Sequence, residues 1–305
     1  MPAGVVTLMN WPSRAGSSYG PDAAGSGVRV IALGTGGPRP DPDRNAACTV
    51  VEVGGEYLVF DTGRGIVRSF ARKAIAFADV AALFITHHHY DHIGELADVM
   101  ISSWLDGRRG RLPVFGPPGT ARTYSLLLEQ VYDRDLEFRM GERADEFAHG
   151  DVTEVRAGPV HETPGWRVSC EEMLHGHALF GPLFRARWIC LGYRIEAQGR
   201  TVSISGDGVR SDALVRLARG ADLHVQCCYL PAAALTTPQL KGLAEHTLAC
   251  SDTAGRIAAE AGVKRLVLTH FRSMTPAMLA ELERDVRRDF DGPVALARDL
   301  DEFVV

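Results

Sequence analysis

The sequence lacks the features that mark secreted and membrane proteins. Its six cysteines include no Cys-x-x-Cys pair, and their wide spacing does not resemble a small disulfide framework. No apolar run reaches the length of a membrane span, and the N-terminus has no basic segment followed by an apolar one. We therefore expect a cytoplasmic protein with reduced thiols and no membrane partner.

An excess of positive charge is also missing. The chain has 33 Lys and Arg against 38 Asp and Glu, which gives a formal net charge of −5. Because nucleic-acid-binding proteins usually present a basic face, this balance argues against a nucleic-acid partner, although it still allows a local basic patch. A length of 305 residues and 46% hydrophobic content allow a large core. Residues 1–27, rich in Gly, Ser, Pro and Ala, predict a flexible lead-in, and residues 28–305 predict a single domain.

What the chain does have is a histidine-rich stretch at 86–92, Thr-His-His-His-Tyr-Asp-His, directly after an apolar run that predicts a strand. Imidazole nitrogen and carboxylate oxygen are common ligands of zinc and similar ions. Since alternate residues of an extended segment point the same way, His87 and His89 can converge on one ion. Asp91 and His92 follow a bend and can face a second ion.

Three other predicted strands end in a polar side chain that could join this site. They are followed by Asp61, Asp207 and His270. For Asp61 two interpretations stay open, a hydrogen bond to a metal-bound histidine from behind and a helix N-cap. The glycine-rich loop at 34–38 has no Walker lysine, so it predicts a tight turn beside a site and not a phosphate cradle.

Together these motifs resemble the metallo-β-lactamase superfamily of hydrolases, in the branch that contains ribonuclease Z and the arylsulfatase- and phosphodiesterase-like enzymes. The resemblance runs from about Val28 to the end of the chain. It implies an α/β fold, a four-layer αββα sandwich with two metal ions at one edge. The motifs that carry it, in order, are Leu33-Gly34-Thr35-Gly36, Phe60-Asp61-Thr62-Gly63, Phe84 to His92, Ser205-Gly206-Asp207 and Leu268-Thr269-His270.

The resemblance also implies a ligand set for two divalent ions, zinc before manganese or iron. For the third histidine of the first ion we choose His175, with His177 and His161 as alternatives. His88 points away from its neighbours, so we expect it behind the ligands or partly exposed. The implied ligands are His87, His89 and His175 for one ion, Asp91, His92 and His270 for the other, and Asp207 between them.

A late predicted helix, 246–261, begins with His246-Thr247, which resembles a His-Ser/Thr motif of ribonuclease Z. In that family the histidine stabilises the substrate or leaving group, with support from a glutamate that is here replaced by Cys227. The long Gly/Pro-rich insertion that serves as a tRNA-binding arm is not found between His175 and Asp207. We expect Asp91 to orient a metal-activated hydroxide and His246 to protonate the leaving group.

The function expected from the sequence is hydrolysis of a small or mid-sized ester by hydroxide activated between two metal ions. Candidate bonds are a phosphodiester, a sulfate ester, a lactone and a thioester. One alternative is a tRNA 3′-end endonuclease like ribonuclease Z, and another is a metal-bearing binding protein without turnover. Aromatic side chains predicted near the site favour an organic substrate or, alternatively, a homodimer interface: Trp104, Phe180, Phe184, Trp188 and Tyr229.

Overall fold

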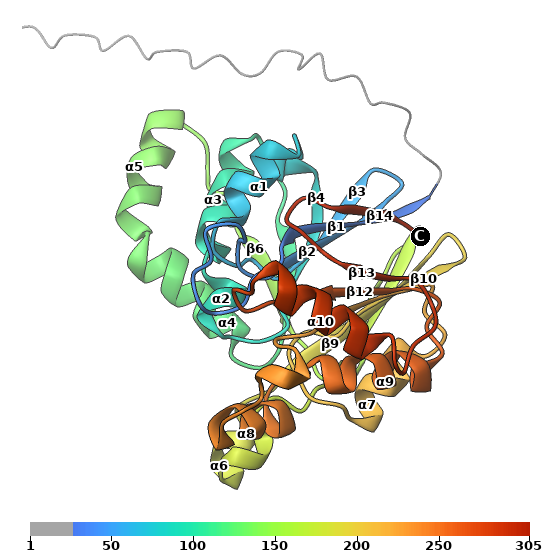
Figure 1. The fold of residues 1–305 in the computed structure, drawn as a ribbon. Coiled ribbons are helices and arrows are strands. Elements are labelled where there is room, and N and C mark those ends of the chain that lie inside the picture. Colours follow the sequence, from blue (N-terminus) through green and yellow to red (C-terminus); the bar gives the residue numbers. More distant parts are fainter. Residues whose placement is uncertain (1–26) are drawn as a thin grey trace, which may run out of the picture.

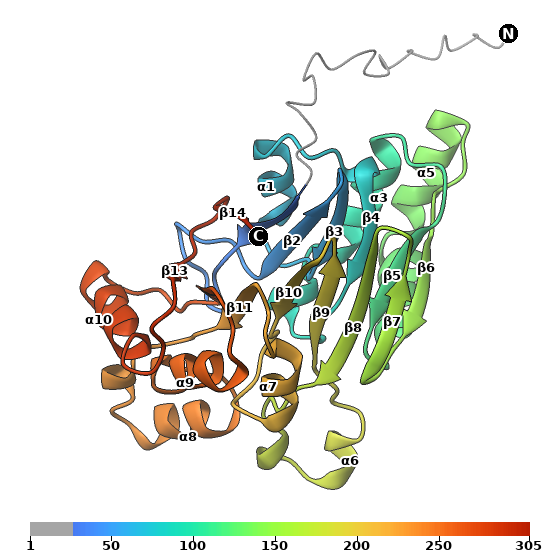
Figure 2. The same ribbon diagram turned by 90° about the vertical axis from the view of Figure 1, so that its right-hand side faces the viewer.

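The computed structural model describes residues 27–305. Residues 1–26, nearly all of the expected lead-in, lie outside the described residues. Figures 1 and 2 show two β-sheets face to face, with helices on the outer side of each. The expected αββα sandwich is confirmed by this layering. The assignment of 28–305 to a single domain stays a prediction.

The first sheet combines antiparallel and parallel strands in the order β14-β1-β2-β3-β4-β5-β6. β14, β1, β2 and β3 pair antiparallel, whereas β3, β4, β5 and β6 pair parallel. The carboxyl ends of β3 and β4 therefore meet at one edge. The strands are β1 (Val28–Gly34), β2 (Cys48–Val53), β3 (Glu56–Phe60), β4 (Val80–Phe84), β5 (Leu112–Gly116), β6 (Gly150–Glu154) and β14 (Glu302–Val304).

The second sheet has the order β13-β12-β11-β10-β9-β8-β7. β7 to β10 pair antiparallel, and β10 to β13 pair parallel. The carboxyl ends of β10, β11 and β12 consequently lie side by side. The strands are β7 (Gly158–Glu162), β8 (Trp166–Glu172), β9 (Leu191–Ala197), β10 (Arg200–Ile204), β11 (Leu223–Cys227), β12 (Leu266–Thr269) and β13 (Val294–Leu296).

Helices cover the outer faces of both sheets. Their ends follow ordinary capping chemistry, as in the helix that starts at Pro276, where the Thr275 hydroxyl accepts from the amide of Met278. No helix among the described residues is long and apolar enough to cross a membrane. The α-helices are α1 (Ile66–Arg72), α2 (Tyr90–Ile93), α3 (Leu96–Leu105), α4 (Thr120–Leu126), α5 (Asp133–Arg143), α6 (Pro182–Arg185), α7 (Asp212–Ala218), α8 (Pro238–His246), α9 (Ser251–Ala261) and α10 (Pro276–Val286), and shorter turns are η1 (Phe77–Asp79), η2 (Leu127–Val131), η3 (His177–Leu179) and η4 (Ala232–Ala234).

The core between the sheets is built on aromatic rings. Phe60, Phe84 and Phe115 stand on neighbouring strands and stack with ring centroids 4.8 and 5.2 Å apart. From the opposite sheet, Tyr193 packs against Phe84 at 5.5 Å, and its hydroxyl donates to the carbonyl of Ile85 at 2.7 Å. This packing fixes the end of β4, and hence the point from which the histidine-rich stretch starts.

The single helix expected over 246–261 is wrong. α8 ends at His246 and α9 begins at Ser251. Between them the Ala249 amide donates to the carbonyl of Gly208 at 2.9 Å, and the Ala249 carbonyl accepts an amide from the loop after β11 at 3.0 Å. Tertiary hydrogen bonds thus interrupt a helical apolar pattern that continues across the break.

Replacing Phe84 by alanine tests the core between the sheets. The side chain is 0% exposed and touches rings of both sheets. We expect the free energy of unfolding to fall by about 3–5 kcal/mol, because the truncation leaves a cavity. Phe138→Ala in α5 is the matched control: that ring is 69% exposed, so the change should stay within about 0.5 kcal/mol. Urea unfolding followed by fluorescence measures both, and equal losses would contradict the proposed importance of this core.

Candidate metal centre

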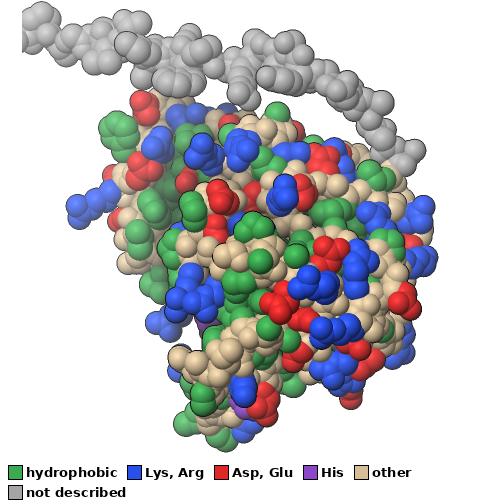
Figure 3. Space-filling view, in the orientation of Figure 1, with side chains coloured by type: hydrophobic (Ala, Val, Ile, Leu, Met, Phe, Trp, Pro, Cys, Tyr) green, Lys and Arg blue, Asp and Glu red, His purple; other side chains and the backbone are tan. Residues whose placement is uncertain are grey.

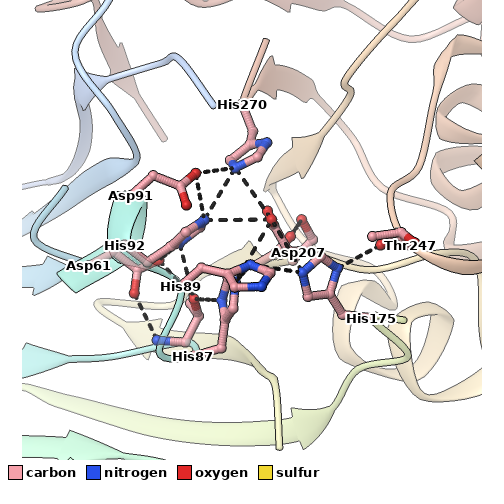
Figure 4. A network of polar contacts seen from close by, with 12 residues as sticks. Asp61, His87, His89, Asp91, His92, His175, Asp207, Thr247 and His270 are labelled. Atoms are coloured by element: carbon pink, nitrogen blue, oxygen red, sulfur yellow. Dashed lines mark hydrogen bonds and ion pairs between the residues drawn. The ribbon is translucent and has the colours of Figure 1, made fainter. Parts of the chain in front are cut away.

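The polar side chains expected at the strand ends gather at one edge of the sandwich, between the two sheets (Figure 4). Asp61 directly follows β3, and the histidine-rich stretch follows β4. From the second sheet, Asp207 comes shortly after β10 and His270 directly after β12. The arrangement follows from the parallel pairing in each sheet, which places these carboxyl ends together.

One group of donor atoms consists of His87, His89, His175 and Asp207, whose potential ligand atoms all lie within 4.8 Å of one another. The Nδ1 atom of His89 is 3.0 Å from Nε2 of His87 and 3.2 Å from Nε2 of His175. Oδ2 of Asp207 lies 3.8 Å from Nε2 of His175 and 3.9 Å from Nε2 of His87. The four donors thus surround one point.

A second group consists of Asp91, His92 and His270. Nε2 of His270 is 3.2 Å from Nε2 of His92 and 3.4 Å from Oδ2 of Asp91. The same Oδ2 atom of Asp207 is 3.3 Å from His270 and 3.5 Å from His92. Asp207 therefore faces both groups with a single oxygen.

The chemistry of these donors fits bound divalent cations. Asp91 Oδ2, Asp207 Oδ1 and His270 Nδ1 are buried without a hydrogen-bond partner among the described residues, a situation that costs free energy unless another partner is bound. Burial, and then the neighbouring His175, lowers the pKa of His89 to about 4, so this ring is neutral and offers a lone pair. Burial opposes the ionisation of Asp207, but the nearby imidazoles, His270 foremost, hold its pKa well below the usual value.

Asp61 supports the cluster from behind. One carboxylate oxygen accepts from the Thr86 amide, and the other from the Thr86 hydroxyl, each at 2.8 Å. The second oxygen also lies 2.7 Å from Nδ1 of His92, which orients that ring. The N-cap of α1 is Gly65 without a side-chain hydrogen bond. The geometry therefore matches the first of the two interpretations of Asp61 and not the second.

Two residues at the cluster adopt a left-handed backbone, Asp61 with φ of 64° and His270 with φ of 60°. For residues other than glycine, such a conformation costs on the order of 1–3 kcal/mol. Neighbouring hydrogen bonds maintain it: the Asp61 amide donates to the carbonyl of Phe84 at 2.9 Å, and the amide of Phe271 donates to Thr35 at 2.9 Å. The fold accepts local strain in order to turn these two side chains into the site.

The glycine-rich loop after β1 lies against the cluster, as expected. A Cβ atom on Gly37 would approach Cε1 of His270 to 3.1 Å and the Tyr229 ring to 3.3 Å. The Gly37 amide also donates to the carbonyl of Phe271 at 3.0 Å. Only a residue without a side chain lets the loop come this close, so the loop forms one wall of the site.

Of the three candidates for the third histidine, the structure brings His175 into the cluster. Its Nδ1 donates to the carbonyl of Thr247 at 2.7 Å, which leaves Nε2 facing the other donors. Nδ1 of His177 instead accepts from the His175 amide at 3.0 Å. The ring of His161, on β7, packs on Phe115 with a centroid separation of 5.1 Å.

His246 occupies the rim and not the cluster. Its carbonyl accepts from the amide of Gly176 at 2.7 Å, next to His175. Its ring is about one-third exposed, and Nε2 lies 3.7 Å from Glu245. Among the described residues, no hydrogen bond or ion pair joins this ring to the clustered donors.

His88 and Trp104 lie outside the donor cluster. His88 points to the other side, and its Nε2 is 2.8 Å from the hydroxyl of Thr120. Trp104, expected among the aromatics near the substrate, instead lies on the buried face of α3 and packs edge-on against Phe147 with ring centroids 5.5 Å apart. The helical period around Trp104 could not reveal that its face turns inward.

The sequence patterns did not assign Cys227 or Trp188 to the cluster. The Cys227 sulfur forms a group with donor atoms of Asp207 and His270, all within 4.8 Å. The indole of Trp188 donates to the carbonyl of His175 at 3.0 Å. Cys227 ends β11, between two strands whose ends were recognised, so the same strand-end pattern could have found it. Trp188 was expected only among the aromatic side chains near the site, and its contact with His175 comes from the folded chain.

Comparisons with known proteins agree with this geometry. The family model for the Beta-lactamase superfamily domain matches residues 56–271. Ribonuclease Z of Mycolicibacterium paratuberculosis is 35% identical, covering 90% of this chain and 96% of its own, and that of Mycobacterium marinum is 33% identical, covering 90% and 97%. The metallo-beta-lactamase fold protein YhfI from Bacillus subtilis superimposes with a TM-score of 0.71 at 19% identity, covering 92% and 100% of the two chains. Human tRNase Z, short form, gives 0.66 at 24% identity, covering 90% and 98%.

The expectation of a small ester substrate and no nucleic-acid partner is wrong, because the similar proteins that span this chain are ribonucleases. That expectation relied on the net charge of −5 and on the missing tRNA-binding arm between His175 and Asp207. The net charge averages the whole surface and says nothing about one site. Figure 3 shows the two signs mixed over the visible face, with Lys and Arg side chains bordering a notch at the left in which a histidine is visible.

Removal of metal should destabilise the protein. We expect a chelator to lower the melting temperature and stoichiometric zinc to restore it, because a cation that binds only the folded state at 100 times its Kd adds about 2.7 kcal/mol. Asp207→Ala should abolish this zinc-dependent shift and the bound metal measured by mass spectrometry. His161→Ala is the matched control, since that histidine lies outside the cluster, and should keep both. An unchanged zinc response in Asp207→Ala would refute the site.

Proposed function

This chain belongs to the β-lactamase superfamily and is a metal-dependent hydrolase, and on that premise we propose that it is an endoribonuclease of the ribonuclease Z type, acting at the 3′ end of precursor tRNA. The observation that carries the proposal is the similarity to ribonuclease Z at 35% identity over 90% of the chain. The donor cluster supports it, because no expected position is missing.

We propose that the cluster holds two divalent ions. Zinc is favoured because imidazole nitrogens dominate the donor set, with manganese or iron as alternatives. Oδ2 of Asp207 lies 3.3–3.9 Å from four histidine nitrogens, so Asp207 would help to hold both ions. The proposed ligands are His87, His89, His175 and Asp207 for one ion, and Asp91, His92, His270 and Asp207 for the other.

Divalent ions held here would supply Lewis acidity that lowers the pKa of water and neutralises charge on a phosphodiester. The protein side chains would position the reactants. Asp91 is 1% exposed, and its Oδ2 has no hydrogen-bond partner among the described residues. That oxygen faces His270 and is the proposed ligand atom. The other carboxylate oxygen of Asp91 can orient the attacking water and take up its proton.

His246 is proposed to donate a proton to the leaving oxygen. Its backbone is tied to the segment of His175 through the amide of Gly176, which fixes its position at the rim. Its ring is partly exposed and can turn toward a bound substrate. Attack of water at phosphorus would break the P–O3′ bond, leaving a 3′-hydroxyl on the tRNA and a 5′-phosphate on the trailer. The proton delivered by His246 would complete that hydroxyl.

The proposal predicts cleavage of a precursor tRNA that carries a 3′ trailer. The zinc-loaded protein should release the trailer in one cut, and end-labelling of both fragments would identify the 3′-hydroxyl and 5′-phosphate. His87→Ala should lose this activity by at least about 100-fold, because a ligand is removed. His161→Ala should retain it.

Hydrolysis of bis-p-nitrophenyl phosphate, measured in parallel, separates the outcomes. Turnover of this diester without cleavage of precursor tRNA would reject the tRNA assignment and keep a metal-dependent hydrolase. For the role of His246, we expect His246→Ala to slow tRNA cleavage more than hydrolysis of the nitrophenyl ester. The nitrophenolate leaves readily without a proton, whereas a ribose oxygen does not. An equal loss on both substrates would argue against proton donation.

A further inference from the structure

Three aromatic rings lead outward from the metal centre, and we name them the aromatic ridge: Phe180, Phe184 and Trp188. Phe180 and Phe184 have centroids 4.2 Å apart, and Phe184 and Trp188 have centroids 5.6 Å apart. At its inner end the indole of Trp188 lies 4.8 Å from the ring of His89. The ridge therefore starts at a proposed metal ligand and continues toward the surface.

The outer part of the ridge is exposed in a way that the core aromatics are not. Phe180 is 46% exposed and Phe184 is 42% exposed, beside Leu179 at 55% and Leu183 at 87%. The surface beside the site therefore exposes a patch of apolar side chains. Such patches on soluble proteins are usually binding surfaces.

The geometry of the rings suits a planar ligand. The interplanar angles are 36° between Phe180 and Phe184 and 28° between Phe184 and Trp188. Rings that are closer to parallel than to edge-on, at these separations, stack on one another and form a short column. The η3 turn directly precedes Phe180 and packs against α8, which anchors the start of the segment that holds the rings. A planar ligand group could extend this column at its exposed rings.

Positive charge accompanies the ridge. Arg185 and Arg187 lie between Phe184 and Trp188 in the sequence, and both are exposed. No ion pair joins either of them to another described residue, in contrast to Arg210, which pairs with Glu260 at 2.6 Å. The segment 176–188 contains no Asp or Glu. Flat apolar faces next to unpaired guanidinium groups match bases joined by phosphates.

A second positive group borders the centre on the side of the glycine-rich loop. Arg64 donates to the carbonyl of Pro38 at 3.3 Å, and its guanidinium lies 5.3 Å from the centroid of the exposed Tyr90 ring. The amide of Arg272 donates to the carbonyl of Tyr229, next to His270. Arginine and aromatic residues thus occur on both sides of the clustered donors.

We propose that the aromatic ridge binds single-stranded nucleic acid, stacking unpaired bases next to the bond that is cut. The inference rests on the proposed ribonuclease function. Base stacking on aromatic side chains strengthens binding by about 5- to 150-fold per base and tolerates any sequence. Arg185 and Arg187 contact the phosphates between the stacked bases. A duplex keeps its bases paired and stacked on each other, so the ridge selects unpaired ends.

A second copy of this chain fits the ridge less well. Two-fold symmetry brings the same patch of both copies together. It would set Arg185 and Arg187 against the same residues of the other copy, and segment 176–188 offers no carboxylate to pair with them. A polyanion such as RNA supplies the negative charge that would pair with these arginines.

The test is direct binding of a fluorescein-labelled RNA of about eight nucleotides to the zinc-loaded protein, measured by anisotropy. The RNA carries phosphorothioate linkages to slow its hydrolysis. The double variant Phe180→Ala with Phe184→Ala should weaken binding by about 10-fold or more, because stacking of at least one base is lost. Phe184→Trp should retain most of the affinity, since it keeps a flat face. Phe138→Ala, an exposed phenylalanine of α5, is the matched control and should bind like the unaltered protein.

The charge contribution has its own measurement. The logarithm of the affinity should fall linearly with the logarithm of salt concentration. For Arg185→Ala with Arg187→Ala, that slope should be shallower by about 0.7 for each phosphate that the variant no longer neutralises. A blunt-ended duplex RNA should bind more weakly than the single strand and respond less to the phenylalanine double variant.

These outcomes separate the ridge from the proposed function. If the phenylalanine variants bind the single strand as the unaltered protein does, the ridge inference is overturned, even where precursor tRNA is cleaved. If tRNA is not cleaved but the ridge variants lose affinity, the ridge stands and the tRNA assignment fails. Circular dichroism and bound-metal content exclude misfolding as the cause. If light scattering shows a dimer that becomes a monomer in the double variant, the ridge is a subunit interface and the inference is rejected.

Discussion

The constraint on which the structure depends is the confinement of donor atoms around one buried carboxylate oxygen. Oδ2 of Asp207 lies 3.3–3.9 Å from nitrogens of four histidines. Buried polar atoms at this density fit a cation between them, because three are left without a hydrogen-bond partner among the described residues. The two sheets meet at this point, since each contributes donors from its parallel strand ends. The metal site and the packing of one sheet on the other are therefore one feature.

The scaffold tolerates local cost in order to hold this arrangement. Asp61 and His270 take left-handed backbone conformations, and the aromatic core anchors the end of β4 from which the histidines project. Hydrogen bonds from Thr86 and Thr247 fix ligand orientation from outside the cluster. Rigid placement of this kind suits hydrolysis, in which the gain comes from positioned charge more than from motion.

The net charge of the chain and the charge around its site convey different information. An overall charge of −5 led to the wrong expectation about nucleic acid, because it sums charges over the whole surface. Away from the site, carboxylates pair with arginines such as Arg210 and Arg216. Around the site, Arg185 and Arg187 have no such partner among the described residues and stand beside stacked rings. The proposed enzyme would thus combine a catalytic centre of fixed geometry with a surface that binds an unpaired RNA end of any sequence.

The sequence by itself determined the fold family and most of the clustered residues. The His-x-His-x-Asp-His spacing is local, and Asp61, Asp207 and His270 each follow an apolar strand, so short patterns carry their positions. Three outcomes came only from the tertiary structure. It brought His175, and not His177 or His161, into the cluster. It also buried the side chain of Trp104 and ended α8 at His246. Those outcomes depend on hydrogen bonds and packing between segments far apart in the chain, such as Thr247 with His175 and Ala249 with Gly208. A local sequence pattern holds no information about such partners, and therefore the stacking of the ridge emerged only from the folded chain.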